Sequence, residues 1–195
     1  LISFVPDFND YNKEENIEQE LNRALELFKR LKLENDLDQA QKMIRKLSQE
    51  QKELSKESGK KDLPLEDLKK QQSEITQKFG EFKRDLDNLE SLNQELKRPE
   101  PLSPTQSSED NIDESLQEIA DALEEKQRKK AGKKQEETSE EMKDLSERLA
   151  SMQSNMETET LNENIEDLNR ILDDLIKLSF EQETIMKSFR GLKPM

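Results

Sequence analysis

The apolar residues of this chain recur at alternating spacings of three and four, the repeat that lines up side chains along one face of a helix. The widest such face lies between Leu161 and Phe189, where further apolar residues flank the main stripe. A wide apolar sector needs several packing neighbours. We therefore expect this C-terminal helix, opened by a capping signature at Thr160 and Glu163 and ended by Gly191, to be the most enclosed element. Its stripe comprises Leu161, Ile165, Leu168, Leu172, Leu175, Gln182, Met186 and Phe189.

Two long helices are predicted in the N-terminal half. The first begins near Asn12, changes the phase of its apolar stripe between residues 32 and 35, and ends at Ser58-Gly59. The second begins at Pro64, because proline is tolerated in the first turn of a helix. Only a few residues separate the two, which predicts an antiparallel hairpin. The heptads of the second helix are Leu65, Leu68, Gln72, Ile75, Phe79, Phe82, Leu86, Leu89, Asn93 and Leu96.

A segment rich in proline and serine, residues 98–110, divides the chain in this interpretation. It is expected to be an extended linker between an N-terminal part, residues 1–97, and a second helical hairpin, residues 111–195. The apolar cluster in residues 1–11 is expected to lie back on a helix. Between residues 111 and 157 the apolar stripe shifts phase across Gly132, so this stretch is either two helices or one helix broken there.

The composition supports an all-α fold with thin helical seams. Only 30% of the residues are apolar and 40% are charged, whereas an ordinary globular domain has roughly 45–50% and about 25%. We expect elongated antiparallel helical hairpins or a coiled-coil bundle of four to five long helices. The same heptads would also serve association between chains, so a homo-oligomer stays an open alternative.

The residue inventory argues against catalysis and against several classes of partner. The chain has no Cys and no His, which removes thiol chemistry and the commonest acid, base and metal ligands at neutral pH. Its glycines form no phosphate-binding loop, and we expect neither a metal nor a cofactor. A formal charge of −14 disfavours nucleic acid as a partner. No apolar run approaches the ~20 residues that span a bilayer, and the N-terminal residues do not resemble a signal peptide.

One basic run interrupts the acidic sequence. It could contact an anionic partner, because each lysine near a charged membrane surface contributes about 1 kcal/mol. The favoured interpretation is an exposed connector whose positive charges are balanced by neighbouring glutamates, since no aromatic residues alternate with the basic ones. The candidate residues are Lys126, Arg128, Lys129, Lys130, Lys133 and Lys134.

The C-terminal stretch resembles the coiled-coil region of large Bacteroidetes envelope proteins of a DUF4175-type family. The residues that carry the resemblance are Leu175, Leu178, Ser179, Phe180, Gln182, Glu183 and Met186. The resemblance implies a periplasmic helical segment of a larger, membrane-anchored envelope protein, and it carries no catalytic residues. We therefore expect a non-enzymatic scaffold or spacer that binds protein partners. The alternative is a cytoplasmic coiled-coil adaptor or chaperone-like clamp that grips clients through its Met and Leu stripes.

Overall fold

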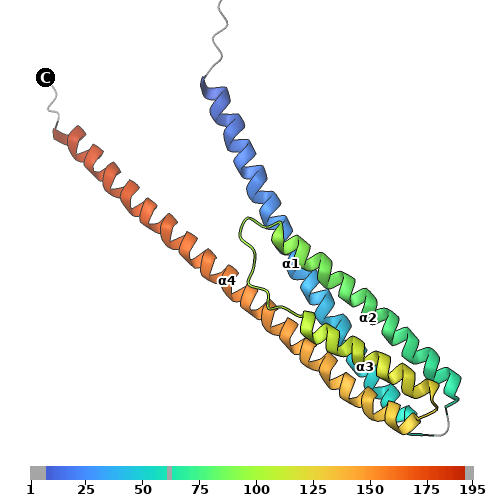
Figure 1. The fold of residues 1–195 in the computed structure, drawn as a ribbon. Helices are drawn as coiled ribbons and strands as arrows, with labels where there is room; N and C mark the ends of the chain where they lie inside the picture. The colour runs from blue at the N-terminus through green and yellow to red at the C-terminus, as the bar shows by residue number, and fades with distance from the viewer. Residues whose placement is uncertain (1–7, 61–62, 192–195) are drawn as a thin grey trace, which may run out of the picture. The chain divides into compact units, whose positions relative to one another are not determined.

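The computed structural model describes residues 8–60 and 63–191, and the regular structure of these residues is entirely helical (Figure 1). The four helices are α1 (Phe8–Ser58), α2 (Leu65–Gln94), α3 (Gln106–Glu124) and α4 (Arg128–Gly191). The predicted all-α fold is thus confirmed. Contacts divide the chain into two units between Gln153 and Ser154, so that α4 belongs to both.

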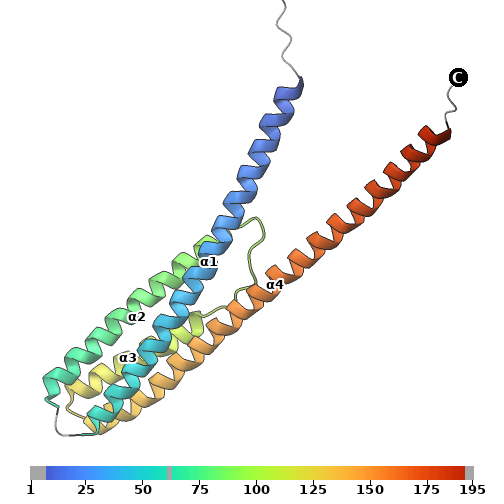
Figure 2. The ribbon, with the colours of Figure 1, turned by 180° about the vertical axis from the view of Figure 1, so that it is seen from behind.

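The first unit contains a bundle in which successive helices run in opposite directions (Figures 1 and 2). The α1–α2 and α3–α4 connections lie at the same end of the bundle. Hydrogen bonds join α1 to α4, as from Ser48 Oγ to the Ser139 carbonyl at 2.7 Å. They also join α3 to α4, as from Ser115 Oγ to Glu141 Oε2 at 3.1 Å. The N-terminal part of α4 therefore packs in antiparallel fashion against both α1 and α3.

The core of the bundle follows the predicted heptads of α2. Phe79 and Phe82 are fully buried and stack with ring centroids 5.7 Å apart. Full burial of a large apolar side chain stabilises a fold by about 1.5–3 kcal/mol, so these two rings are major contributors. The buried residues of α2 are Leu68, Gln72, Ile75, Phe79, Phe82, Leu86, Leu89 and Asn93.

A layer of buried polar side chains crosses the same core. Gln51 Nε2 of α1 donates to Gln72 Oε1 of α2 at 3.0 Å, and Gln72 Nε2 donates back to Gln51 Oε1 at 3.3 Å. Gln135 Nε2 of α4 donates to the same Gln72 oxygen at 2.9 Å. Ser58 Oγ at the end of α1 donates to Gln135 Oε1 at 2.6 Å. These bonds connect three helices, and only one axial alignment of the helices satisfies them all.

The break in the second half lies before Gly132, at residues 125–127. Lys126 there has φ 59°, a left-handed conformation that ends α3 and turns the chain into α4. The stretch 111–157 therefore contains two helices. Gly132 lies inside α4, where a side chain would meet the Ser55 carbonyl oxygen at 3.2 Å and Ser58 Cβ at 3.3 Å. The glycine permits a close approach of α4 to α1 and does not break the helix.

The predicted helix start at Thr160 is wrong, because α4 continues without interruption from Arg128 to Gly191. The second hairpin expected in residues 111–195 is therefore formed by α3 and the beginning of α4. A Thr-x-x-Glu pattern caps a helix only where the preceding residues leave the helical conformation. Here the preceding turns remain helical, and Thr158 Oγ donates to the Ser154 carbonyl one turn earlier at 2.9 Å.

The expectation that residues 161–189 form the most enclosed element is also wrong for the side chains that are described. Leu172, Phe180 and Met186 are each more than half exposed, whereas the core residues of the first unit are almost fully buried. A wide apolar sector needs a covering surface, but it does not show whether that surface belongs to the same chain. Leu161, Ile165, Leu168, Leu175 and Phe189 of that stripe, and the apolar cluster of residues 1–11, have side chains outside the described part.

In the described residues no helix is both long enough and apolar enough to cross a membrane.

Candidate binding surfaces

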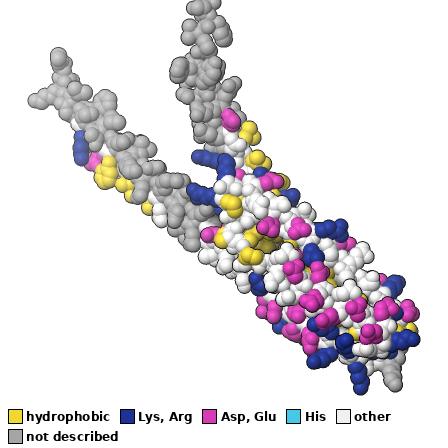
Figure 3. Space-filling model, viewed as in Figure 1, with side chains coloured by type: hydrophobic (Ala, Val, Ile, Leu, Met, Phe, Trp, Pro, Cys, Tyr) yellow, Lys and Arg dark blue, Asp and Glu magenta, His cyan; other side chains and the backbone are white. Residues whose placement is uncertain are grey.

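An exposed apolar face occupies α1 just before it enters the bundle. The large apolar side chains from Leu21 to Leu31 are exposed, whereas Leu33 and Leu37 are fully buried. This change coincides with the phase change predicted at residues 32–35, where the helix begins to face α2. Figure 3 shows hydrophobic side chains on the surface of this stretch. The residues of the apolar α1 face are Leu21 (65% exposed), Leu25 (53%), Leu27 (60%), Phe28 (65%) and Leu31 (55%).

Ion pairs hold the base of this face in place. Lys29 Nζ lies 3.0 Å from Glu95 Oε2, and Arg30 Nε lies 2.8 Å from Glu100 Oε1. Glu26 accepts a hydrogen bond from the backbone N–H of Lys97 at 2.5 Å. The partners of these α1 residues are Glu95, Lys97 and Glu100, and all three belong to the connection that follows α2. The helix is thus anchored by charged contacts at the point from which its apolar face projects.

The second unit carries an exposed apolar stripe of its own. The described residues Leu172, Ile176 and Phe180 follow one another at four-residue intervals and therefore lie along one side of α4. Their exposed fractions are 55%, 46% and 65%, and that of Met186 is 55%. Apolar side chains that recur along one helix face in this way are a feature of protein interaction sites.

Only the first part of the predicted linker, residues 98–110, is free of helix, because α3 already begins at Gln106. That first part is a structured strap along the first unit. We call residues 98–105 the strap, which contains no helix. Asn93 Nδ2 donates to the Glu100 carbonyl at 2.9 Å, and the Glu100 N–H donates to Asn93 Oδ1 at 2.8 Å. Arg148 of α4 donates to the Pro104 carbonyl at 2.9 Å. The strap contains a tight turn, in which the Leu102 N–H donates to the Glu100 carbonyl at 2.8 Å. It lies inside the first unit, where Asn93 of α2 and Arg148 of α4 hold it.

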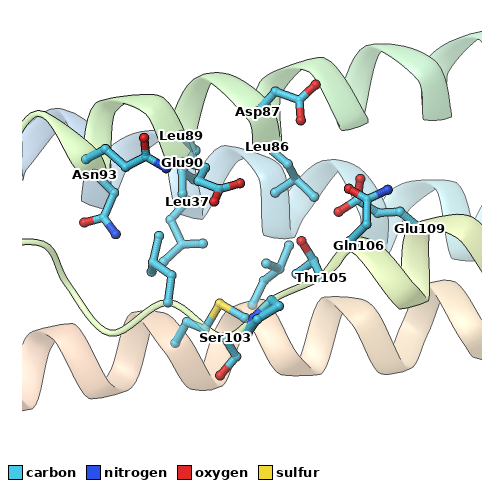
Figure 4. Close-up of a pocket in the computed structure, with 15 residues that line it drawn as sticks. Leu37, Leu86, Asp87, Leu89, Glu90, Asn93, Ser103, Thr105, Gln106 and Glu109 are labelled. Carbon is cyan, nitrogen blue, oxygen red and sulfur yellow. The ribbon is translucent and has the colours of Figure 1, made fainter.

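A pocket of about 270 Å³ lies beneath the strap (Figure 4). We call it the strap pocket. Apolar side chains from three helices form part of its wall, with Leu102 and Pro104 contributed by the strap. Polar groups line it as well, including Asn93, Thr105 and Glu109. The helical apolar residues are Leu37, Leu86, Leu89, Leu149 and Met152.

Glu109 is the buried carboxyl group of this pocket. It is only 5% exposed and belongs to the first turn of α3. Burial raises its pKa above the ordinary value, chiefly because desolvation penalises the carboxylate. A hydrogen bond with the Thr105 side chain and the charge of Lys83 act against this rise, while Asp87 and Asp110 add to it. Glu109 precedes Ile112 by three residues, so the helical stripe itself could have placed it on the inner face.

The basic run lies at the end of the bundle where α1 connects to α2 and α3 connects to α4. Its residues differ from one another in their contacts. Arg128 donates from Nη2 to the Leu63 carbonyl, which ties the start of α4 to the α1–α2 connection. Lys134 Nζ lies 2.8 Å from Glu118 Oε2 of α3, and its pKa is raised chiefly by this hydrogen bond. Lys133 pairs more loosely with Glu137 at 3.5 Å. Lys126, Lys129 and Lys130 are exposed. The run is thus partly a set of structural contacts and does not converge on one point.

Comparison with known proteins finds no protein family, no curated protein and no solved structure that matches this chain. Among the described residues, no group of three or more His, Cys, Asp or Glu side chains is arranged to hold a metal ion.

Proposed function

We propose that this protein is a non-enzymatic helical scaffold that binds protein partners through exposed apolar helix faces. The observation that carries the proposal is the apolar α1 face. It adjoins a bundle that buries its own apolar core residues, and beside that core these five large side chains stay more than half exposed. Leaving them in water forgoes the ~1.5–3 kcal/mol that burial of each could contribute. A partner that covers the face would recover this free energy.

The partner best suited to this face is an amphipathic helix. The apolar positions recur at helical spacing, which matches the anchors of helix-in-groove and coiled-coil recognition. A second copy of the chain and a different protein both present such helices. The placement of this scaffold in the bacterial envelope, as a periplasmic part of a larger membrane-anchored protein, rests on the resemblance carried by residues 175–186.

Substitution of the apolar α1 face tests the proposal directly. In the double variant Leu25→Ser and Phe28→Ser we expect unchanged melting temperature, because both side chains are exposed. We expect the variant to lose association, measured as solution mass by light scattering and as proteins retained from an envelope extract. Asn22→Ser on the same exposed helix is the matched control and should retain both. If the double variant and the control show the same solution mass and the same retained proteins, the face is not the docking site.

The alternative function, a chaperone-like clamp, is left with fewer candidate surfaces. Met142 and Met152 are 0% and 6% exposed, and Met156 is 2% exposed. The Met stripe of α4 is therefore buried and offers no exposed apolar face to a client. A clamp would have to use the apolar α1 face or the stripe of the second unit. Suppression of aggregation of several unrelated unfolding proteins would support the clamp, whereas selective retention of one partner supports the scaffold.

A further inference from the structure

The strap pocket combines an apolar wall with an acidic one. Leu37, Leu86 and Met152 come from three different helices and are nearly buried. The carboxylates that line it are Asp87 and Glu90 of α2 and Glu109 of α3. Figure 4 shows Glu90 and Glu109 on opposite sides of Leu86. The lining residues include no lysine and no arginine, so their formal charge at neutral pH is negative.

The volume limits the size of a ligand. The strap pocket, at about 270 Å³, falls just below the range of ~300–1,000 Å³ that is typical for drug-sized ligands. An occupant is therefore a small molecule or a single side chain. It needs an apolar part to cover the leucines and a polar end to satisfy the carboxylates.

The charge of the polar end follows from the neighbouring groups. An anionic end would lie beside the buried Glu109 carboxylate, with the exposed carboxylates of Asp87 and Glu90 at the rim, which is unfavourable by Coulomb repulsion. A cationic end would pair with Glu109 and remove the penalty that burial imposes on its charged form. The nearby cations are already engaged, Lys83 with Asp113 and Arg148 with the Pro104 carbonyl and Ser108. Neither Lys83 nor Arg148 lines the pocket, so neither side chain occupies it.

We propose that the strap pocket binds a small amphiphilic cation, a primary alkylammonium group, with its alkyl chain against Leu37, Leu86 and Met152 and its nitrogen at Glu109. The same chemistry occurs in a free alkylamine and in a lysine side chain of a peptide. The strap, held by Asn93 and Arg148, forms the outer wall of the site. This binding activity is independent of docking on the apolar α1 face.

Titration of the full chain with n-hexylammonium chloride tests the proposal, with sodium hexanoate as the charge control. We expect saturable binding of one hexylammonium per chain by calorimetry, a shift of the Met152 methyl resonance in NMR spectra, and no saturable binding of hexanoate. Affinity should rise about fourfold per methylene from butylammonium to hexylammonium, as expected for burial of each added CH₂. Titration with Nα-acetyl-lysine methylamide distinguishes the sources, because binding as tight as that of butylammonium would indicate a lysine side chain.

The variant Glu109→Gln should weaken hexylammonium binding at least fivefold, because the amide keeps the shape but not the charge. Glu81→Gln, an exposed carboxylate of α2 outside the pocket, is the control and should bind as the unmodified chain does. Equal binding of hexylammonium and hexanoate, unchanged affinity in Glu109→Gln, or no binding at all would each overturn the proposal.

Discussion

Gln72 has the most connected side chain of the buried polar layer, since its amide bonds to both Gln51 and Gln135. Its removal leaves two buried amides without this partner, and each unsatisfied buried polar group costs about 1–3 kcal/mol. We therefore expect Gln72→Ala to lower the free energy of unfolding by about 2 kcal/mol or more, measured by urea denaturation. Gln71→Ala, at the exposed neighbouring position, should change it by less than about 0.5 kcal/mol. Similar values for the two variants would show that the amide layer is not a significant source of stability.

Because of Glu109, the free energy of unfolding should fall as pH rises above the ordinary pKa of a glutamate. The folded-state pKa of Glu109 is raised by burial, so the folded chain holds this proton more tightly than the unfolded chain does. The residue therefore disfavours folding increasingly as pH rises from the ordinary value of about 4.3 through the raised pKa. We expect Glu109→Gln to melt at a higher temperature than the unmodified chain at pH 7, with the difference shrinking toward pH 4.

Glu118 supplies a control of opposite sign. The hydrogen bond and charge of Lys134 lower its pKa, so its contribution to stability is present above the ordinary value and is lost as pH falls through the lowered pKa. Glu118→Gln should therefore melt lower than the unmodified chain at pH 7, and this difference should vanish in acid. If the melting-temperature difference for Glu109→Gln does not vary with pH, its carboxyl group does not titrate as proposed.

At the scale of the helices, the two phenylalanines Phe79 and Phe180 have opposite surroundings. Phe79 is 0% exposed in α2 and Phe180 is 65% exposed in α4. Phe79→Asp would bury a carboxylate among apolar side chains, which costs several kcal/mol, and we expect it to abolish cooperative unfolding. Phe180→Asp should leave the melting temperature and the helical circular dichroism signal almost unchanged. If residues 161–189 were the most enclosed element, as expected from the sequence, Phe180→Asp would unfold the C-terminal part of the chain. Equal damage by both substitutions would therefore contradict the exposed position of Phe180.

The sequence predicts where most of the helices lie and which face of α2 is buried. It does not predict which elements pack against a given helix. The heptads of α2 and the turn after Ser58 follow from local spacing and from the conformational preferences of Gly and Pro. Apolar periodicity cannot tell which face is covered by the same chain, and this explains the error for residues 161–189. A capping pattern is likewise local, and a helix can run through it, as α4 does at Thr160. The polar layer is hidden in the sequence because Gln72 occupies a heptad position as a leucine would.

At the scale of the first unit, the strap is the feature that sequence reasoning described only in part. Prolines and serines indicated an extended linker, and residues 98–105 contain no helix. Nothing local in the sequence showed that Asn93 and Arg148 would hold this segment against the helices. The strap pocket exists only because of those contacts, so its lining residues could not be grouped beforehand. Hydrogen bonds between residues 44 positions apart, as from Arg148 to Pro104, depend on the fold as a whole.

The described contacts predict that the bundle folds without the rest of the chain. A fragment of residues 26–157 keeps the ion pairs of Lys29 and Arg30, the strap, and every core side chain described in the first unit. We expect its melting temperature to lie within about 4 °C of that of the full chain, a shift that corresponds to roughly 1 kcal/mol. A fragment of residues 40–157 lacks Leu33 and Leu37, which are both fully buried, and should be destabilised by several kcal/mol. Loss of cooperative unfolding in the longer fragment would mean that residues before 26 or after 157 are needed to complete the core of the bundle.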